Sequence, residues 1–218
     1  MPVETDASET FSKRFVDRAQ AERYRDRYRT GRRVRIDRLE RAALRYLLGG
    51  LGYLDIALDV PGGTGRLTPV LAEFADRVIL ADASAAMLDL AREELSGGRI
   101  TFLETDARHM ALDTASVDLV FCHRYLHHIH EPEARACVFR ELARVSRRYA
   151  IISYYTPGTR DYGRWLRGSI IGHETHHRPL NRRRFIEETA AAGLRFLHGA
   201  TLRRVPVRAE FCLFDHGD

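Results

Sequence analysis

Three glycines within four positions follow an apolar stretch that contains an aspartate. Residues 57–60 read Ala-Leu-Asp-Val, and Gly62, Gly63 and Gly65 come shortly afterwards. Apolar residues then recur at helical spacing over 67–74. Glycine tolerates positive φ and lets a ligand approach the backbone closely, and the N–H groups at a helix start attract polar or anionic groups. The pattern therefore predicts a strand, a tight turn and a helix that together form a nucleotide-type cofactor site.

The spacing of the glycines discriminates between cofactors. A dinucleotide fingerprint needs a third glycine three residues after the second, but Thr68 stands at that position after Gly65. The stretch from Asp59 to Gly65 instead resembles motif I of the class I S-adenosylmethionine-dependent methyltransferases, whose common form is acidic-x-Gly-x-Gly-Thr-Gly. Pro61 stands where that family has its first glycine, which predicts a stiffer turn with φ near about −65°.

The resemblance, which covers residues 50–214, implies both a fold and a cofactor. The fold is α/β, with a Rossmann-like doubly wound sheet of seven strands, mostly parallel with a C-terminal antiparallel strand, and with N-terminal helices over the cofactor pocket. The cofactor is S-adenosylmethionine. The motif residues expected to contact it are Asp59, Pro61, Gly62, Gly63, Thr64 and Gly65.

Two later acids stand at the ends of predicted strands. Asp82 closes the strand predicted at 77–82, where Rossmann-like folds place an acid that accepts hydrogen bonds from ribose hydroxyls. It is also placed to interact with the dipole of the helix that Ser84 caps, and both roles can coexist. In the resembled family, an aspartate after the third strand faces the adenine amino group. The third strand is predicted here at 100–104, so the resemblance implies this role for Asp106. Taken alone, an aspartate in a loop usually forms a turn. The expected cofactor-binding set is completed by Ala83, Met87, Ala107, Arg108 and Tyr28.

The N-terminal part predicts one or two helices over 11–28 and another over 35–48, which ends at two glycines. In the resembled family such helices often fold over the cofactor pocket. Tyr24, Tyr28 and the nearby arginines are therefore candidates for contact with the methionine end of the cofactor, and spacing alone does not choose among them.

A dense group of polar residues follows the strand predicted at 117–122. Ligands of open α/β sheets bind outside the carboxyl ends of the strands, so this group is expected to border the transferred methyl. His123 and His127 are the candidates for a general base towards a hydroxyl acceptor, because histidine titrates near about pH 6.5. His128 is a further candidate, and packing at a helix start is an equally open interpretation.

Residues 156–180 are rich in glycine and arginine and contain His173, His176 and His177. Metal binding is one interpretation of the three histidines. No cysteine lies nearby, however, and the following Arg178-Pro179 disfavours a continuing helix. We therefore expect no metal and interpret the segment as a lid that faces the substrate.

The length of 218 residues suits one methyltransferase domain over 13–218. We expect a disordered tail over 1–12, a helical cap over 13–49, a cofactor-binding core over 50–155, a lid or substrate insertion over 156–180, and a C-terminal helix and hairpin over 181–218.

Positive charge is concentrated near the N-terminus. Residues 13–45 carry thirteen basic and five acidic side chains, whereas residues 46–218 balance at zero. The segment is either a patch for an anionic partner, such as RNA, a phosphorylated substrate or a membrane surface, or a solvated helix face with internal ion pairs. No apolar run is long enough to span a bilayer and no signal peptide is recognisable, so we expect a cytoplasmic protein. The three separated cysteines predict buried thiols.

These observations together predict methyl transfer from S-adenosylmethionine to a small-molecule acceptor, directed to oxygen or nitrogen. The Asn/Asp-Pro-Pro-Tyr motif of amino-group methyltransferases that act on nucleic acids is absent, because Cys122-His123-Arg124-Tyr125 occupies its place. The alternatives are an RNA methyltransferase that uses the basic N-terminal segment, a nicotinamide-dependent oxidoreductase, and a non-catalytic cofactor-binding protein.

Overall fold

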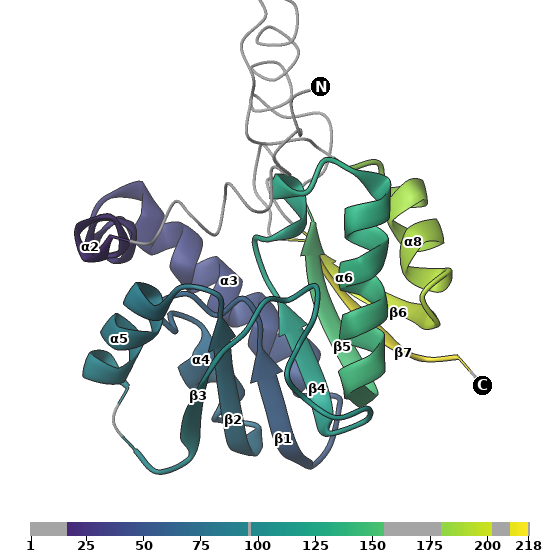
Figure 1. Ribbon diagram of the computed structural model, residues 1–218, viewed down its shortest axis with the longest axis horizontal. Helices are drawn as coiled ribbons and strands as arrows, with labels where there is room; N and C mark the ends of the chain where they lie inside the picture. The colour runs from purple at the N-terminus through teal and green to yellow at the C-terminus, as the bar shows by residue number, and fades with distance from the viewer. Residues whose placement is uncertain (1–16, 96, 155–179, 202–209, 218) are drawn as a thin grey trace, which may run out of the picture.

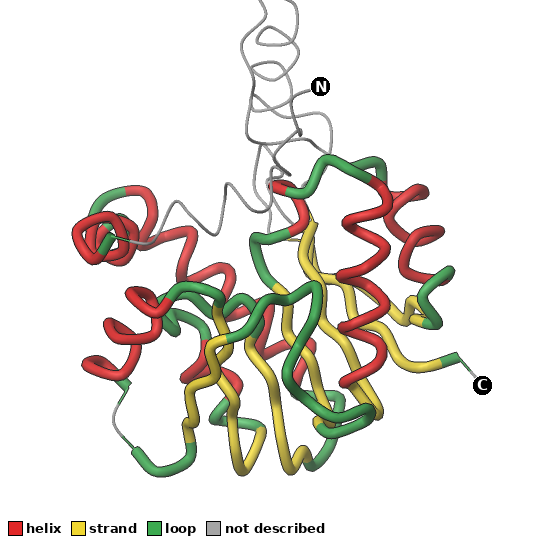
Figure 2. The backbone as a smooth tube through the Cα atoms, in the orientation of Figure 1, coloured by secondary structure: helices red, strands yellow, loops and turns green. Residues whose placement is uncertain are grey.

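The computed structural model describes residues 17–95, 97–154, 180–201 and 210–217. They form a seven-stranded sheet with helices on both faces (Figures 1 and 2). The strands are β1 (Leu54–Asp59), β2 (Ala75–Asp82), β3 (Ile100–Glu104), β4 (Val117–Cys122), β5 (Ser146–Tyr154), β6 (Leu194–Thr201) and β7 (Glu210–His216). The helices are α2 (Arg18–Asp26), α3 (Arg32–Leu48), α4 (Thr68–Leu71), α5 (Ala85–Glu94), α6 (Pro132–Val145) and α8 (Arg182–Ala190), with a 3₁₀ turn η2 (Leu126–His128).

The order of the strands is β3-β2-β1-β4-β5-β7-β6. Neighbours from β3 to β5 pair in parallel, and β7 runs antiparallel to both β5 and β6. The predicted fold class and the C-terminal hairpin are confirmed. Because the order reverses between β1 and β4, the connections leave these two strands in opposite directions, and a crevice opens at their carboxyl ends.

The central strand β4 shows how the sequence builds the two core layers. All six of its residues are buried, as expected for a parallel strand covered on both faces. Leu119 and Phe121 join the core cluster that includes residues of α3 and α4, whereas Val120 and Cys122 join the cluster with α6 and α8. Alternate residues of one strand thus hold both helical layers against the sheet.

Two predicted helix starts are capped as their sequences suggest. Met87 N donates to Ser84 Oγ over 3.2 Å at the start of α5, and Arg183 N donates to Asn181 Oδ1 over 2.9 Å at the start of α8. The cap at Ser84 matters for the site, because it fixes the chain immediately after Asp82.

The helix after the glycine turn is shorter than its spacing predicts. Apolar periodicity extends to Phe74, but α4 ends at Leu71 and β2 begins at Ala75. Glu73 N and Phe74 N donate to the carbonyls three residues back, which tightens the last turn. The chain thereby reverses quickly into β2, while Val70 and Leu71 remain buried.

Several expectations fall on residues outside the described ranges. These are the tail over 1–12, nearly all of the lid over 156–180, and the histidines His173, His176 and His177. None of the described helices is long and apolar enough to cross a membrane.

Phe185 of α8 is the aromatic contact that fixes this helix to the sheet. Its buried ring stacks on Tyr154 of β5 with centroids 4.3 Å apart and meets Phe214 of β7 at 5.7 Å. We expect Phe185→Ala to lower the free energy of unfolding by about 3–5 kcal/mol, because it leaves a cavity in a packed core. Urea denaturation measures this loss. The control is Leu197→Ala on β6, whose side chain is 40% exposed; an equal loss in both variants would contradict the packing role.

Candidate active site

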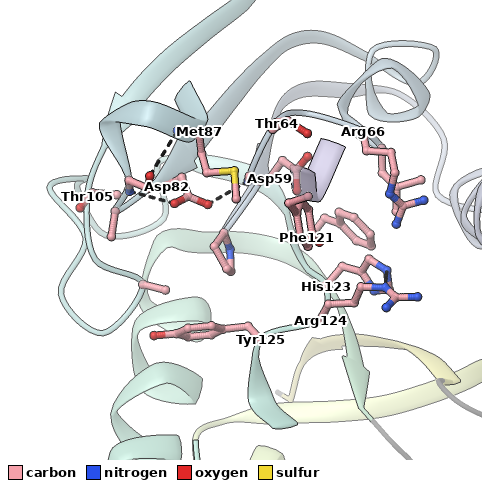
Figure 3. Close-up of a pocket in the computed structure, with 18 of the residues that line it drawn as sticks. Asp59, Thr64, Arg66, Asp82, Met87, Thr105, Phe121, His123, Arg124 and Tyr125 are labelled. Atoms are coloured by element: carbon pink, nitrogen blue, oxygen red, sulfur yellow. Dashed lines mark hydrogen bonds between the residues drawn. The ribbon is translucent and has the colours of Figure 1, made fainter. Parts of the chain in front are cut away.

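A pocket lies at the crevice between the glycine turn, the end of β2 and the loop after β4. In Figure 3, Asp82, Met87 and Thr105 lie on one side of it and Arg66, His123 and Arg124 lie on the other. Most of the expected cofactor-binding residues line this pocket: Asp59, Pro61, Gly62, Gly63, Thr64, Asp82, Ala83, Met87, Asp106 and Ala107. Gly65, Arg108 and Tyr28 do not line it.

Two glycines of the turn, Gly63 and Gly65, differ in how closely other atoms surround them. Gly63 and Gly65 both have positive φ, of 58° and 72°. A Cβ added to Gly63 would meet no atom within 4 Å, whereas one on Gly65 would lie 2.3 Å from Leu95 Cδ1. Gly65 therefore serves the close packing of the turn against α5 and β2, and Gly63 leaves free space at the pocket.

Asp59 and Asp82 are two carboxylates without an ion-pair partner among the described residues. Asp59 is 3% exposed and accepts a hydrogen bond of 2.6 Å from Thr68 Oγ1. Asp82 accepts hydrogen bonds from Gly63 N at 2.8 Å and Ser84 N at 2.9 Å. Burial raises the pKa of each carboxyl to about 6 despite these hydrogen bonds. Both groups are therefore mainly ionised at neutral pH.

Asp106 differs from these two acids because it has a cationic neighbour. Burial alone would raise the pKa of its carboxyl, but hydrogen bonds from Arg108 outweigh it and the pKa lies below its ordinary value. The closest contact, from Arg108 Nη2 to Asp106 Oδ2, is 2.7 Å. Asp106 therefore lies in the wall of the pocket, and Arg108 lies outside the wall and binds the Asp106 carboxylate.

His123 is in the opposite wall, and both of its ring nitrogens are engaged. Nε2 accepts from Arg124 Nε at 3.1 Å, and Nδ1 lies 2.9 Å from Ser153 Oγ. Burial lowers the pKa of His123 to about 4, so the imidazole is neutral at pH 7. Glu40 Oε1 also lies 3.5 Å from Nε2 and opposes the effect of burial on this pKa.

Of the two histidines expected beside the acceptor, only His123 lines the pocket. His127 is buried in η2, with its ring centroid 3.8 Å from that of His128. Among the residues that the structure describes, no group of three or more His, Cys, Asp or Glu side chains is placed to hold a metal ion.

The N-terminal helices contribute to the pocket differently from the expectation. Tyr24 lines it, but Tyr28 is behind it, where its ring packs against the guanidiniums of Arg66 and Arg124. Arg66 and Arg124 are themselves wall residues. Arg124 belongs to the polar group expected after the strand at 117–122, and the position of Arg66 directly after Gly65 is the signal that could have identified it. Tyr125 belongs to the polar group expected after the strand at 117–122, whereas sequence reasoning missed four other wall residues: Leu67, Ser84, Thr105 and Phe121.

Comparison with known proteins agrees with this geometry. Residues 57–148 match the family model described as a methyltransferase domain. No curated protein matches the chain significantly.

Among solved structures, magnesium protoporphyrin IX methyltransferase from Synechocystis PCC 6803, with bound S-adenosylhomocysteine, is 19% identical with a TM-score of 0.76, and the match covers 97% of this chain and 100% of that one. The 1,6-didemethyltoxoflavin-N1-methyltransferase of Burkholderia thailandensis is 18% identical with a TM-score of 0.70, covering 100% and 93% of the two chains. A methyltransferase from Methanosarcina mazei is 16% identical with a TM-score of 0.66, covering 78% and 96%. Residues 57–148 thus match a methyltransferase domain, and the chain has the fold of these solved methyltransferases.

Proposed function

We propose that this protein transfers a methyl group from S-adenosylmethionine to a small-molecule acceptor, at an oxygen or a nitrogen atom. The observation that carries the proposal is one pocket with two unlike ends. Carboxylates gather beside the glycine turn, and His123, Arg124 and Tyr125 form a separate wall after β4. Two of the structural neighbours are named for small acceptors, a magnesium porphyrin and a didemethyltoxoflavin. These names support an acceptor of that size here.

The residues beside the turn fit the cofactor. Gly63 leaves open space in which a Cβ would meet nothing, and each Asp82 oxygen holds one backbone N–H, which leaves lone pairs for further donors. We assign Asp82 to the ribose hydroxyls, and Asp106 with the backbone of Ala107 to the adenine. Met87 and Ala83 lie in the adjoining wall.

When bound, S-adenosylmethionine supplies an electrophilic methyl group on its sulfonium. The protein's own contribution is then to hold the nucleophile in line, which can supply much of the acceleration. His123 suits orientation better than proton abstraction, because its Nε2 lone pair accepts from Arg124 and its pKa is about 4. His127 is outside the pocket lining, behind this wall, and we assign it to packing.

The RNA alternative has less support. Five arginines of the basic segment form ion pairs within the fold, to carboxylates of α2, α3, α5 and the turn after α4: Arg18, Arg25, Arg29, Arg41 and Arg45. Much of the local charge excess is thus compensated by the protein itself. This pairing favours the interpretation of the segment as a solvated helix face.

The proposal is tested with a labelled methyl group. Protein incubated with S-adenosylmethionine carrying a tritiated methyl is offered a panel of small hydroxyl and amino compounds and, separately, total RNA. We expect label in the small-molecule fraction together with stoichiometric S-adenosylhomocysteine, measured by mass spectrometry. Label that enters only the RNA would overturn the proposed acceptor class.

Asp82→Ala tests the ribose assignment. We expect the Kd for S-adenosylhomocysteine, measured by calorimetry, to rise more than about tenfold, because charge-assisted hydrogen bonds contribute about 1.5–3 kcal/mol each. Asp89→Ala is the matched control, since Asp89 is exposed on α5 and does not line the pocket. A folded Asp82→Ala protein with unchanged affinity would exclude the assignment.

The ionised carboxylate of Asp59 is expected to lower the free energy of unfolding. Its pKa is raised from 3.8 to about 6 in the folded protein, so folding disfavours the ionised form. The cost is fully present above about pH 6 and disappears as the pH falls towards 4; a rise of this size corresponds to about 3 kcal/mol. We expect Asp59→Asn, which keeps an oxygen for Thr68, to raise the free energy of unfolding at pH 8 by up to about that amount.

Urea denaturation at pH 8 and pH 5 measures this effect, and the gain should be roughly halved at pH 5. Asp89→Asn provides the comparison for an exposed aspartate. A loss of stability in Asp59→Asn at pH 8 would mean that the charge at this position stabilises the fold.

A further inference from the structure

The exposed side of helix α3 carries arginines and apolar side chains but no acid. Residues at spacings of three and four along a helix lie on one side of it. This spacing joins five exposed residues of α3 into one row: Arg32, Arg35, Leu39, Ala42 and Tyr46. Exposed Arg38 flanks the row, three residues from Arg35 and four from Ala42. We call these residues, with Arg38, the outer face of α3.

The acids of α3 point away from this face. Asp37 and Glu40 both accept hydrogen bonds from Arg66, which lies beside the glycine turn. Three leucines of the helix are buried and join the core layer on that side of the sheet: Leu44, Leu47 and Leu48. The two sides of α3 therefore differ in charge as well as in burial, because its acids face the protein and the outer face holds only cations.

The arginines of the outer face have no acidic partner within the described part of the chain. The ion pairs of α3 are made there by other residues: Asp37, Glu40, Arg41 and Arg45. Arg32, Arg35 and Arg38 form no ion pair with any described residue, and all three are exposed. The positive charge that the described fold leaves uncompensated in this helix is therefore gathered on the outer face, where it can attract an anionic partner.

Two of the four large apolar side chains that are exposed in the described part of the chain lie on the same face. Leu39 is 39% exposed and Tyr46 is 70% exposed. The Tyr46 ring meets the ring of His198 edge-on, with centroids 6.4 Å apart, so the face continues onto β6 at the edge of the sheet. A single exposed apolar residue is ordinary, but here two alternate with arginines along a row of about 21 Å.

The outer face lies on the outside of the molecule. α3 covers the sheet face opposite to α6 and α8 (Figure 1). Because its outer residues are exposed, no described element packs over them. Small ligands bind in concave sites, whereas the convex side of a helix can lie flat on an extended surface. The shape therefore favours a large partner over a small ligand.

We propose that the outer face of α3 binds the surface of an anionic lipid bilayer. Its arginines bind headgroup phosphates, and Leu39 and Tyr46 enter the boundary between the headgroups and the acyl chains. The phosphate backbone of RNA uses arginines but gives Leu39 no apolar partner, so the mixture of side chains favours a bilayer. None of the outer-face residues lines the cofactor pocket, and the proposal does not rest on the proposed methyl acceptor.

Vesicle binding by the 218-residue chain tests the proposal. Vesicles of phosphatidylcholine alone are compared with vesicles in which phosphatidylserine replaces half of it. Co-sedimentation over a range of lipid concentrations gives the apparent affinity for each. We expect binding to the anionic vesicles only, and weaker binding as the salt concentration rises, because salt screens the charges of both surfaces.

Two double variants separate the two kinds of contact. Arg35→Gln with Arg38→Gln is expected to lower the affinity for anionic vesicles about thirtyfold, because each basic residue near such a surface contributes about fivefold. Leu39→Gln with Tyr46→Gln is expected to lower it about tenfold, because apolar burial is lost. All four positions are exposed and glutamine is a good helix former, so both variants are expected to fold.

Arg140→Gln with Arg183→Gln is the matched control. It removes the same charge from exposed positions of α6 and α8, on the opposite face of the sheet. We expect its affinity for anionic vesicles to stay within about twofold of wild type, because charges beyond a Debye length are screened. The midpoint of urea denaturation checks that each variant is folded.

Four results would overturn the proposal. The first is a wild-type chain that does not bind anionic vesicles. The second is an equal loss in the control and in the arginine variant, which would indicate a general effect of charge. The third is a loss in only one of the two α3 variants, because the bilayer must contact both kinds of side chain. The fourth is filter retention of total RNA that needs Arg35 and Arg38 but not Leu39 and Tyr46, without vesicle binding, which would assign the face to nucleic acid.

Discussion

Three backbone N–H groups hold the glycine turn between its two neighbouring strands, and the pocket depends on them. Val60 N donates to Phe121 O of β4 at 2.9 Å, Gly62 N donates to Ala81 O of β2 at 2.8 Å, and Gly63 N donates to the Asp82 carboxylate at 2.8 Å. The turn is thus fixed from both sides of the point where the strand order reverses. The side chains that end β2 and β4 are consequently brought to one crevice, whatever their separation in the sequence.

The sequence predicts the parts of this arrangement that follow from local pattern. Apolar runs place β3 and β4 at their observed residues, because buried parallel strands need such runs. The acids at 59, 82 and 106 meet because parallel strands bring their carboxyl ends to the same edge. The topology converts three separate local signals into one wall of the pocket.

The parts that could not be predicted depend on contacts between distant segments. Glu40 meets Arg66 and Arg124 across 26 and 84 residues, and nothing in their spacing indicates the pairing. Tyr24 lies in α2 and Tyr28 lies just beyond the end of that helix, and only the packing of this segment decides which one faces the pocket. The short α4 has the same kind of cause, since the rapid return into β2 overrides an apolar periodicity that continues to Phe74.

The attachment of the helical cap links these contacts to ligand binding. The ion pairs between α2 and α5, such as Arg18 with Glu93 and Arg29 with Glu94, join largely exposed side chains and each contribute little. The buried cluster around Glu40 and the apolar side of α3 are the stronger attachments. Removal of one member of a buried ionic cluster is costly, because the remaining charges stay desolvated. Because Glu40 belongs to α3 and its partners Arg66 and Arg124 line the pocket, the contacts that hold this helix also fix the position of two pocket residues.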